Sequence, residues 1–182
     1  MVTIANAVGS GDLGIELDIP AVETDLDAFS TEYDPSNYHG LYARFVEDGP
    51  LVTAYRSGKY IVTGASSFDE LHETNEMFLS ALVDLGIINS SVSPGFGVQN
   101  VVCTAELGDP VNLNALAIGL GLEVTEYEPE QFPGLVYRPE QFSAVLLVFG
   151  SGSVVITGAT DLQSAETAFE HLRSQIETVL PD

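Results

Sequence analysis

Positive charge is the scarcest property of this sequence. Its 182 residues contain five lysines and arginines against 27 aspartates and glutamates, which gives a formal net charge of −22. A chain this acidic repels itself in dilute buffer, whereas the Debye length of about 3 Å in 1 M salt screens that repulsion. The composition therefore predicts a protein from a salt-rich cytosol, and the alternative is an acidic mesophilic protein. The cations are Arg44, Arg56, Lys59, Arg138 and Arg173.

Cysteine and the usual patterns of catalytic or metal sites are also scarce. Cys103 is the only cysteine, so an internal disulfide is excluded, which fits a reducing compartment. The three histidines have no metal-ligand spacing, and no C-x-x-C, Ser/His/Asp or paired-carboxylate signature stands out. The sequence thus predicts a protein that is not an enzyme and that uses no metal or cofactor.

Long hydrophobic runs are missing too. No apolar run approaches the roughly 20 residues that span a bilayer, and the chain shows no signal peptide. Hydrophobic residues nevertheless make up 45% of the sequence, which excludes a disordered chain despite the charge. We therefore expect an ordered, soluble, cytoplasmic protein of one domain or two small ones.

What the sequence does contain is an internal repeat. The segment Y-E-P-E-Q-F-P-G-L-V-Y-R at 127–138 matches Y-D-P-S-N-Y-H-G-L-Y-A-R at 33–44. At the same offset Asn6 matches Asn100, and a T-G-A run recurs. A period this long that occurs only twice predicts a pseudo-twofold architecture rather than a solenoid. The two repeats are expected at residues 1–90 and 91–182.

Each repeat predicts the same order of elements: a strand, a short helix, several antiparallel strands and a long helix. Ser67 and Glu70 have the spacing of a capping box at the start of one long helix. The glycine-rich loop at 9–14 and its counterpart at 103–109 are predicted to be turns, because they lack the spacing of phosphate-binding loops. The expected strands lie at about 2–8, 40–46, 51–56, 59–64, 97–102, 135–138, 144–149 and 153–157, and the expected helices at 19–29, 68–85, 113–122 and 161–180.

This order predicts an α+β fold in which two repeats form one curved antiparallel sheet with helices on its convex face. The concave face would then be bare, although the residues expected there are apolar or aromatic. An uncovered apolar surface usually marks a binding site. The alternative is that the helices cover these residues, and strand alternation alone does not decide between the two. The residues are Val8, Tyr38, Tyr55, Val102, Phe132, Leu147 and Phe149.

The repeated motifs resemble those of the TATA-box-binding protein family. The pattern is Y-[DE]-P-x-x-[FY]-x-G-L-x-x-R, followed by [FY]-x-S-G and then T-G-A, and the resemblance covers residues 2–180. The acidic composition points to the form of the family found in salt-loving archaea. The resemblance implies a saddle-shaped sheet and a general transcription initiation factor that binds and bends A/T-rich promoter DNA from the minor groove.

The resemblance also implies two pairs of aromatic wedges that enter between base steps. Phe132 and Phe149 form the second pair, whereas the first pair falls on Tyr38 and Tyr55. A tyrosine ring can wedge almost as well as phenylalanine, but its hydroxyl must stay solvated or reach a polar base edge. How far the first pair inserts is therefore left open.

The polar side chains with which the family recognises base edges correspond here to four residues that match between the repeats. Asparagine amides and threonine hydroxyls can meet the adenine N3 and thymine O2 acceptors, and G·C pairs add an amino donor there, so A·T is preferred. The alternative is that the asparagines are strand-end caps and the threonines ordinary strand residues. The four residues are Asn6, Thr63, Asn100 and Thr157.

Cations that could contact DNA phosphates are few. Arg44, Lys59 and Arg138 match basic positions of the family, but Ser153, the counterpart of Lys59, is neutral. Counterion release contributes a salt slope of about −0.9 per phosphate contact, so few contacts predict a shallow slope. Apolar contact with the groove must then supply the affinity.

The resemblance further implies protein partners. In the family, the second-repeat loop binds the B-type initiation factor, and RNA polymerase is an indirect partner. Glu128 and Glu130 are the matching carboxylates in this sequence. The alternative for this loop is a solvated acidic turn. A different function also stays open, namely a divergent paralogue that keeps the saddle but acts as a protein-interaction module with weak or no DNA binding. Four features keep that alternative open: Tyr38, Tyr55, Thr53 in place of an apolar residue, and the missing cations.

Overall fold

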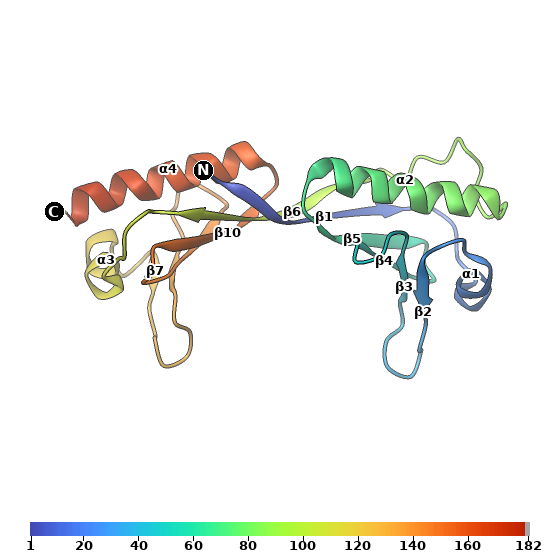
Figure 1. Cartoon of the computed structure of the whole chain (residues 1–182), viewed down its shortest axis with the longest axis horizontal. Coiled ribbons are helices and arrows are strands. Elements are labelled where there is room, and N and C mark those ends of the chain that lie inside the picture. The colour runs from blue at the N-terminus through green and yellow to red at the C-terminus, as the bar shows by residue number, and fades with distance from the viewer. Residues whose placement is uncertain (181–182) are drawn as a thin grey trace. The chain divides into compact units, whose positions relative to one another are not determined.

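The computed structural model describes residues 1–180 and divides into two compact units of the same design (Figure 1). The first unit comprises Asn6–Gln99, and the second comprises Met1–Ala5 together with the chain from Asn100 onward. The leading strand of each repeat crosses this division, so each unit contains the start of the other's first strand. In the second unit the Thr3 and Thr104 hydroxyls lie 3.2 Å apart.

The two units repeat one order of elements. In chain order, the first half contains β1 (Thr3–Asp12), α1 (Ile19–Asp25), β2 (Ser30–Glu32), β3 (Leu41–Arg44), β4 (Leu51–Ala54), β5 (Lys59–Ala65) and α2 (Phe68–Asp84). The second half contains β6 (Gly97–Glu106), α3 (Leu113–Leu120), β7 (Thr125–Glu126), β8 (Leu135–Tyr137), β9 (Val145–Val148), β10 (Ser153–Ala159) and α4 (Leu162–Val179).

The helices begin where side chains cap them. Ser67 accepts a hydrogen bond from the Glu70 N–H at 3.1 Å, as the capping-box spacing predicts. Asp161 plays the same part for α4 and accepts from the Ser164 N–H at 2.7 Å. None of the helices within residues 1–180 combines the length and hydropathy of a membrane-spanning segment.

The strands pair antiparallel, in the order β2-β3-β4-β5-β1 for the first repeat and β6-β10-β9-β8-β7 for the second. In β3, β8 and β9, buried residues alternate with half-exposed ones. β4 is an exception, because Val52, Thr53 and Ala54 are all buried. Leu146 and Val148 of β9 are fully buried, whereas Val145 and Leu147 between them are half-exposed. The long helices contact one face of the sheet through β5 in the first unit and β10 in the second (Figure 1). The half-exposed residues therefore lie on a face that none of the helices within residues 1–180 covers, and we call it the open face.

The structure corrects three details of the predicted elements. β1 continues to Asp12 and β6 to Glu106, so the predicted turns at 9–14 and 103–109 begin as strands. α1 ends at Asp25 instead of continuing to Phe29, whose side chain is 59% exposed. The short strands β2 and β7 were not predicted. The other predicted strands and helices are confirmed to within a few residues at their ends.

Candidate nucleic-acid interface

Each unit carries two aromatic rings that meet edge to face on the open face. The ring centroids of Tyr38 and Tyr55 lie 6.2 Å apart with their planes at 70°. Those of Phe132 and Phe149 lie 5.8 Å apart with their planes at 67°. Offset and edge-to-face contacts of this kind are the preferred arrangements of aromatic pairs. The sequence-predicted wedge residues thus form two equivalent pairs, one in each unit.

A glycine lies beneath each aromatic pair. A Cβ atom added to Gly40 would lie 2.8 Å from the Tyr38 ring and 3.1 Å from the Tyr55 ring. At Gly134 the same atom would lie 2.7 Å from Phe132 and 3.1 Å from Phe149. These distances are shorter than ordinary van der Waals contact. The glycine of the repeated G-L-x-x-R motif therefore leaves room for the rings above it.

The two asparagines predicted to read bases have a local partner as well. Asn6 Oδ1 accepts a hydrogen bond from the Gly64 N–H at 2.8 Å, and Asn100 Oδ1 accepts from Gly158 at 3.1 Å. Both glycines have positive φ, 86° and 80°, and lie where the strand pairing shifts register, as at a β-bulge. Because a backbone N–H can only donate, the side-chain oxygen faces it. The amide nitrogen of each asparagine is left to donate elsewhere.

The remaining apolar and threonine positions of the prediction also lie on the open face. Thr63 pairs with Leu51 across β5 and β4, and Thr157 pairs with Val145 across β10 and β9. Val8, Val102 and Leu147 are half-exposed as well. Sequence reasoning missed other half-exposed residues in the same rows of the sheet, which the alternation of each strand could have indicated. They are Ser10, Tyr42, Ile61, Thr104, Val136, Val145 and Val155.

The predicted cations differ in what they contact. The Arg44 guanidinium donates to the Gly49 carbonyl oxygen. Arg138 Nε lies 3.6 Å from a Glu126 carboxylate oxygen, and both side chains are more than half exposed, so the pair adds little stability. Lys59 is exposed. Its counterpart Ser153 donates its hydroxyl hydrogen bond to Glu106, at 2.9 Å. The open face is thus less positive in the second unit than in the first.

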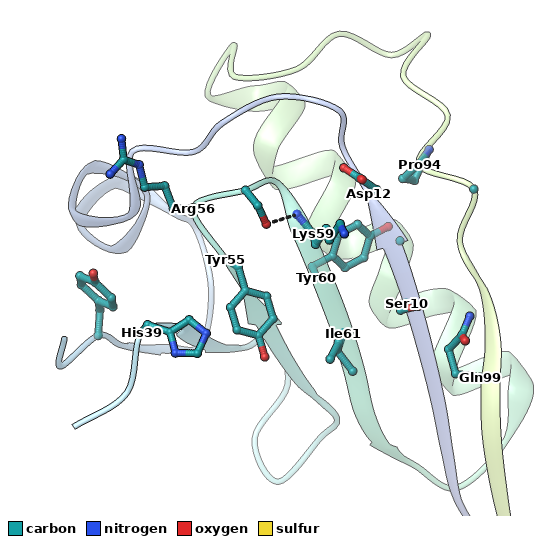
Figure 2. Close-up of a pocket in the computed structure, with 14 residues that line it drawn as sticks. Ser10, Asp12, His39, Tyr55, Arg56, Lys59, Tyr60, Ile61, Pro94 and Gln99 are labelled. Carbon is teal, nitrogen blue, oxygen red and sulfur yellow. Dashed lines mark hydrogen bonds between the residues drawn. The ribbon is translucent and has the colours of Figure 1, made fainter. Parts of the chain in front are cut away.

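A cavity of about 930 Å³ opens beside Tyr55 in the first unit (Figure 2). The rings of His39 and Tyr55 line one side of it, and Ile61 lies on the strand beside them. Arg56 and Lys59 also line the cavity. Arg56 was not predicted as a site residue, and its place after the aromatic residue of [FY]-x-S-G was the signal available for it.

The chemistry of this surface is that of neutral donors and apolar rings. Burial, followed by the hydrogen bond with the Tyr38 hydroxyl, raises the pKa of Tyr55 to about 12. Tyr55 is therefore protonated at neutral pH. Within residues 1–180 no group of three or more histidine, cysteine, aspartate or glutamate side chains is placed to hold a metal ion. The surface is suited to shape-matched apolar contact with a few directed hydrogen bonds.

The loops before the wedges carry exposed acidic residues. In the second unit the Glu128 carbonyl oxygen accepts hydrogen bonds from the N–H groups of Gln131 and Phe132, at 2.9 and 3.0 Å. The side chains of Glu128 and Glu130 are exposed, and within the described chain neither carboxylate takes part in a hydrogen bond or ion pair. Both carboxylates are therefore available to an external partner.

Comparison with known proteins gives a consistent result. The profile of the family described as transcription factor TFIID (or TATA-binding protein, TBP) matches residues 1–85 and 95–179. The chain is 63% identical over 179 residues to "TATA-box-binding protein C" of Halobacterium salinarum, covering 98% of this chain and 99% of that protein. It is 46% identical over 175 residues to "TATA-box-binding protein 1" of Haloferax volcanii, covering 96% and 91%.

Among solved structures, the chain resembles that titled "Methanococcus jannaschii TBP". The TM-score is 0.83 and the sequence identity 39%, over 98% of this chain and 99% of the other. The predicted fold class, an α+β tandem repeat of antiparallel strands with the fold of this family, is confirmed by this match. The predicted family resemblance is confirmed as well.

Proposed function

The chain belongs to the TATA-binding protein family, and on that basis we propose that it is a general transcription initiation factor that binds A/T-rich promoter DNA. It enters the minor groove with the open face, inserts its aromatic pairs between base steps and bends the duplex. It recruits the B-type initiation factor, and through it RNA polymerase. Its place of action is the cell's DNA, so we expect it in the cytoplasm, associated with the nucleoid.

The observation that carries this proposal is the equivalence of the two aromatic pairs. Each pair rests on a glycine, meets at a nearly equal interplanar angle and lies on a face that no helix covers. A core would not leave Phe132 38% exposed. Rings held in edge-to-face contact on an open apolar face are suited to enter a base stack, where both faces of each ring become covered.

The hydrogen-bond geometry supports preference for A·T pairs. Since Gly64 and Gly158 occupy the side-chain oxygens of Asn6 and Asn100, each asparagine presents an N–H donor. The minor-groove edge of A·T pairs offers only the acceptors adenine N3 and thymine O2. Donors held in place at equivalent positions of the two units therefore match an A/T-rich box, and a G·C pair would bring an unmatched amino group.

A band-shift titration on an A/T-rich duplex tests the proposal. The protein should retard and bend this duplex, and a duplex of the same length with a G·C-rich centre should bind at least about tenfold more weakly, because each mismatched pair costs about 1–3 kcal/mol. Equal, weak binding to both duplexes would contradict the proposal. It would favour instead a saddle-fold protein that works only through protein contacts.

Salt should affect this binding little. We expect the affinity to be retained, or to rise, between dilute buffer and molar KCl, because few cations contact phosphates while salt screens the repulsion by many carboxylates. The measurement is the band-shift dissociation constant as a function of KCl concentration. As a matched control, Lys59→Gln removes one exposed cation and should change the log–log slope by about 1. A slope near −6, which is that of about seven phosphate contacts, would refute the prediction.

The glycines under the rings should matter more for binding than for folding. Gly134→Ala places a Cβ 2.7 Å from the exposed Phe132 ring, which must then move. We expect DNA affinity to fall about tenfold, or 1.4 kcal/mol, with little change in thermal stability, because the ring can swing into solvent. Gly150→Ala is the control, since its Cβ would lie 3.8 Å from the nearest atom, the Val111 carbonyl oxygen. If both variants lost affinity to a similar extent, the loss would not depend on the space that Gly134 leaves for the rings.

A further inference from the structure

The open faces of the two units differ in polarity at equivalent positions. One row of paired strand residues in the first unit is Tyr42–Thr53–Ile61, and the equivalent row in the second unit is Val136–Leu147–Val155. The aromatic pair beside the first row is tyrosine, whereas that beside the second is phenylalanine. The first unit thus presents hydroxyl groups where the second presents only carbon.

The hydroxyls of the first unit are organised around one contact. Tyr38 Oη and Tyr55 Oη lie 2.7 Å apart and share a hydrogen bond. The Tyr42 ring stacks parallel to Tyr38, with centroids 5.4 Å apart and planes at 2°, which holds that ring in position. Thr53 is buried, whereas its counterpart Leu147 is half-exposed. The hydroxyl pair is therefore a fixed feature of the first unit.

This pair can both donate and accept further hydrogen bonds. A phenol hydroxyl has one donor and two acceptor lone pairs. The mutual bond uses one donor and one lone pair, which leaves one donor and three lone pairs for other groups. The donor matches adenine N3 or thymine O2, and the lone pairs match the amino group that guanine alone adds to the minor groove. In the second unit, the rings Phe132 and Phe149 would leave that amino group buried without a partner, which is costly.

We propose that the Tyr38–Tyr55 hydroxyl pair makes the first unit tolerant of an amino group in the minor groove, whereas the second unit requires A·T pairs. This inference rests on the proposed function and assigns a base preference to one half of the site. Its consequence is that the protein orients itself on near-symmetric DNA: the first unit takes the half that contains guanine, and the second takes the pure A/T half.

The test uses a symmetric A/T duplex in which 2,6-diaminopurine replaces adenine, because this base adds only the minor-groove amino group to the A·T pattern. Substitution in one half should weaken binding less than about twofold, since the first unit can take that half. Substitution in both halves should weaken it at least about tenfold, or 1.4 kcal/mol. Tyr38→Phe with Tyr55→Phe should show the tenfold loss with one substituted half. Phe132→Tyr with Phe149→Tyr should tolerate both.

Orientation gives an independent readout. A DNA-cleaving reagent attached at Asn37→Cys, in the exposed loop before Tyr38, should cut the substituted half, and Cys103 will not compete for the reagent because it is buried. The inference is overturned if one substituted half costs the wild type tenfold, if the tyrosine-to-phenylalanine variant keeps the tolerance, or if cleavage is equal in both halves. Failure to bind the unmodified duplex would overturn the proposed function itself. Wild type and variants are measured on the same duplexes. Any change in DNA shape caused by the modified base therefore affects all of them equally and does not explain a difference between them.

Discussion

Phe132→Ala and Phe149→Ala are each expected to reduce DNA bending more than Tyr38→Ala or Tyr55→Ala. We expect the phenylalanine rings to insert as pure hydrocarbon, whereas a tyrosine ring that enters the stack must keep its hydroxyl hydrogen-bonded. The unstacking cost of a few kcal/mol per base step is the value known for minor-groove-bending proteins, this family included. A lost wedge removes what compensates that cost, so we expect affinity to fall more than about tenfold, or 1.4 kcal/mol.

Fluorescence energy transfer between the labelled ends of an A/T-rich duplex measures the bend. Phe29→Ala is a control for the loss of an aromatic ring, since Phe29 is 59% exposed and lies in the connection between α1 and β2, and it should leave bending unchanged. Folding of each variant is checked by thermal denaturation. If all four wedge variants bend the duplex equally, the tyrosine pair inserts as fully as the phenylalanine pair, and the predicted difference between the units is wrong.

Sequence reasoning could place the strands but not decide which of their faces is covered. Both faces of β9 read as apolar, because Leu146 and Leu147 are the same residue type. Their burial separates them: Leu146 is fully buried against the helix side, and Leu147 is half-exposed. An apolar face that meets DNA and an apolar face that meets a helix look the same in a sequence. The distinction comes from the helices' packing, which is long-range.

The two readings of the asparagines were posed as alternatives, and the geometry shows that they are compatible. Asn6 is held by the backbone N–H of Gly64, as a capping residue would be. The same bond fixes the orientation of the amide and turns its N–H₂ group outward as a donor. The role as a reader stays a prediction, but a locally anchored amide loses less conformational entropy on binding than a free one.

The errors at β1, β2 and β7 arise from contacts that form only in the folded chain. β1 contains Gly9 and Gly11, which predicted a turn because glycine is disfavoured in strands. In the structure a Cβ at these positions would lie 2.5 Å from the Phe96 ring and 2.7 Å from the Tyr60 ring. The glycines are needed for packing against residues distant in sequence. β2 and β7, with three and two residues, are too short to show any periodicity and form only by pairing with β3 and β8.

The two acidic loops are not equivalent, although their sequences match. In the first unit Asp34 Oδ1 accepts hydrogen bonds from the Ser36 hydroxyl and N–H, at 2.5 and 3.0 Å. These bonds, the hydroxyl first, hold the pKa of the Asp34 carboxyl below its usual range. This carboxylate therefore stabilises its own turn. The carboxylates of Glu128 and Glu130 have no such local role among the described residues, which supports their assignment to a partner.

On a palindromic box of pure A/T sequence neither half is favoured by base contacts, so a partner that recognises only one unit gives the complex its direction. We expect Glu128→Arg with Glu130→Arg to abolish the ternary complex with the B-type initiation factor, since it reverses the charge that a basic partner surface would meet. Binary DNA binding in molar KCl should change less than about threefold, or 0.7 kcal/mol. Band shifts with and without the factor separate the two effects. Asp34→Arg is the position-matched control, and Asp34→Asn keeps the turn's acceptor while it removes the charge. Both should leave the ternary complex intact, and loss of that complex in the Asp34 variants alone would place the partner on the first unit instead.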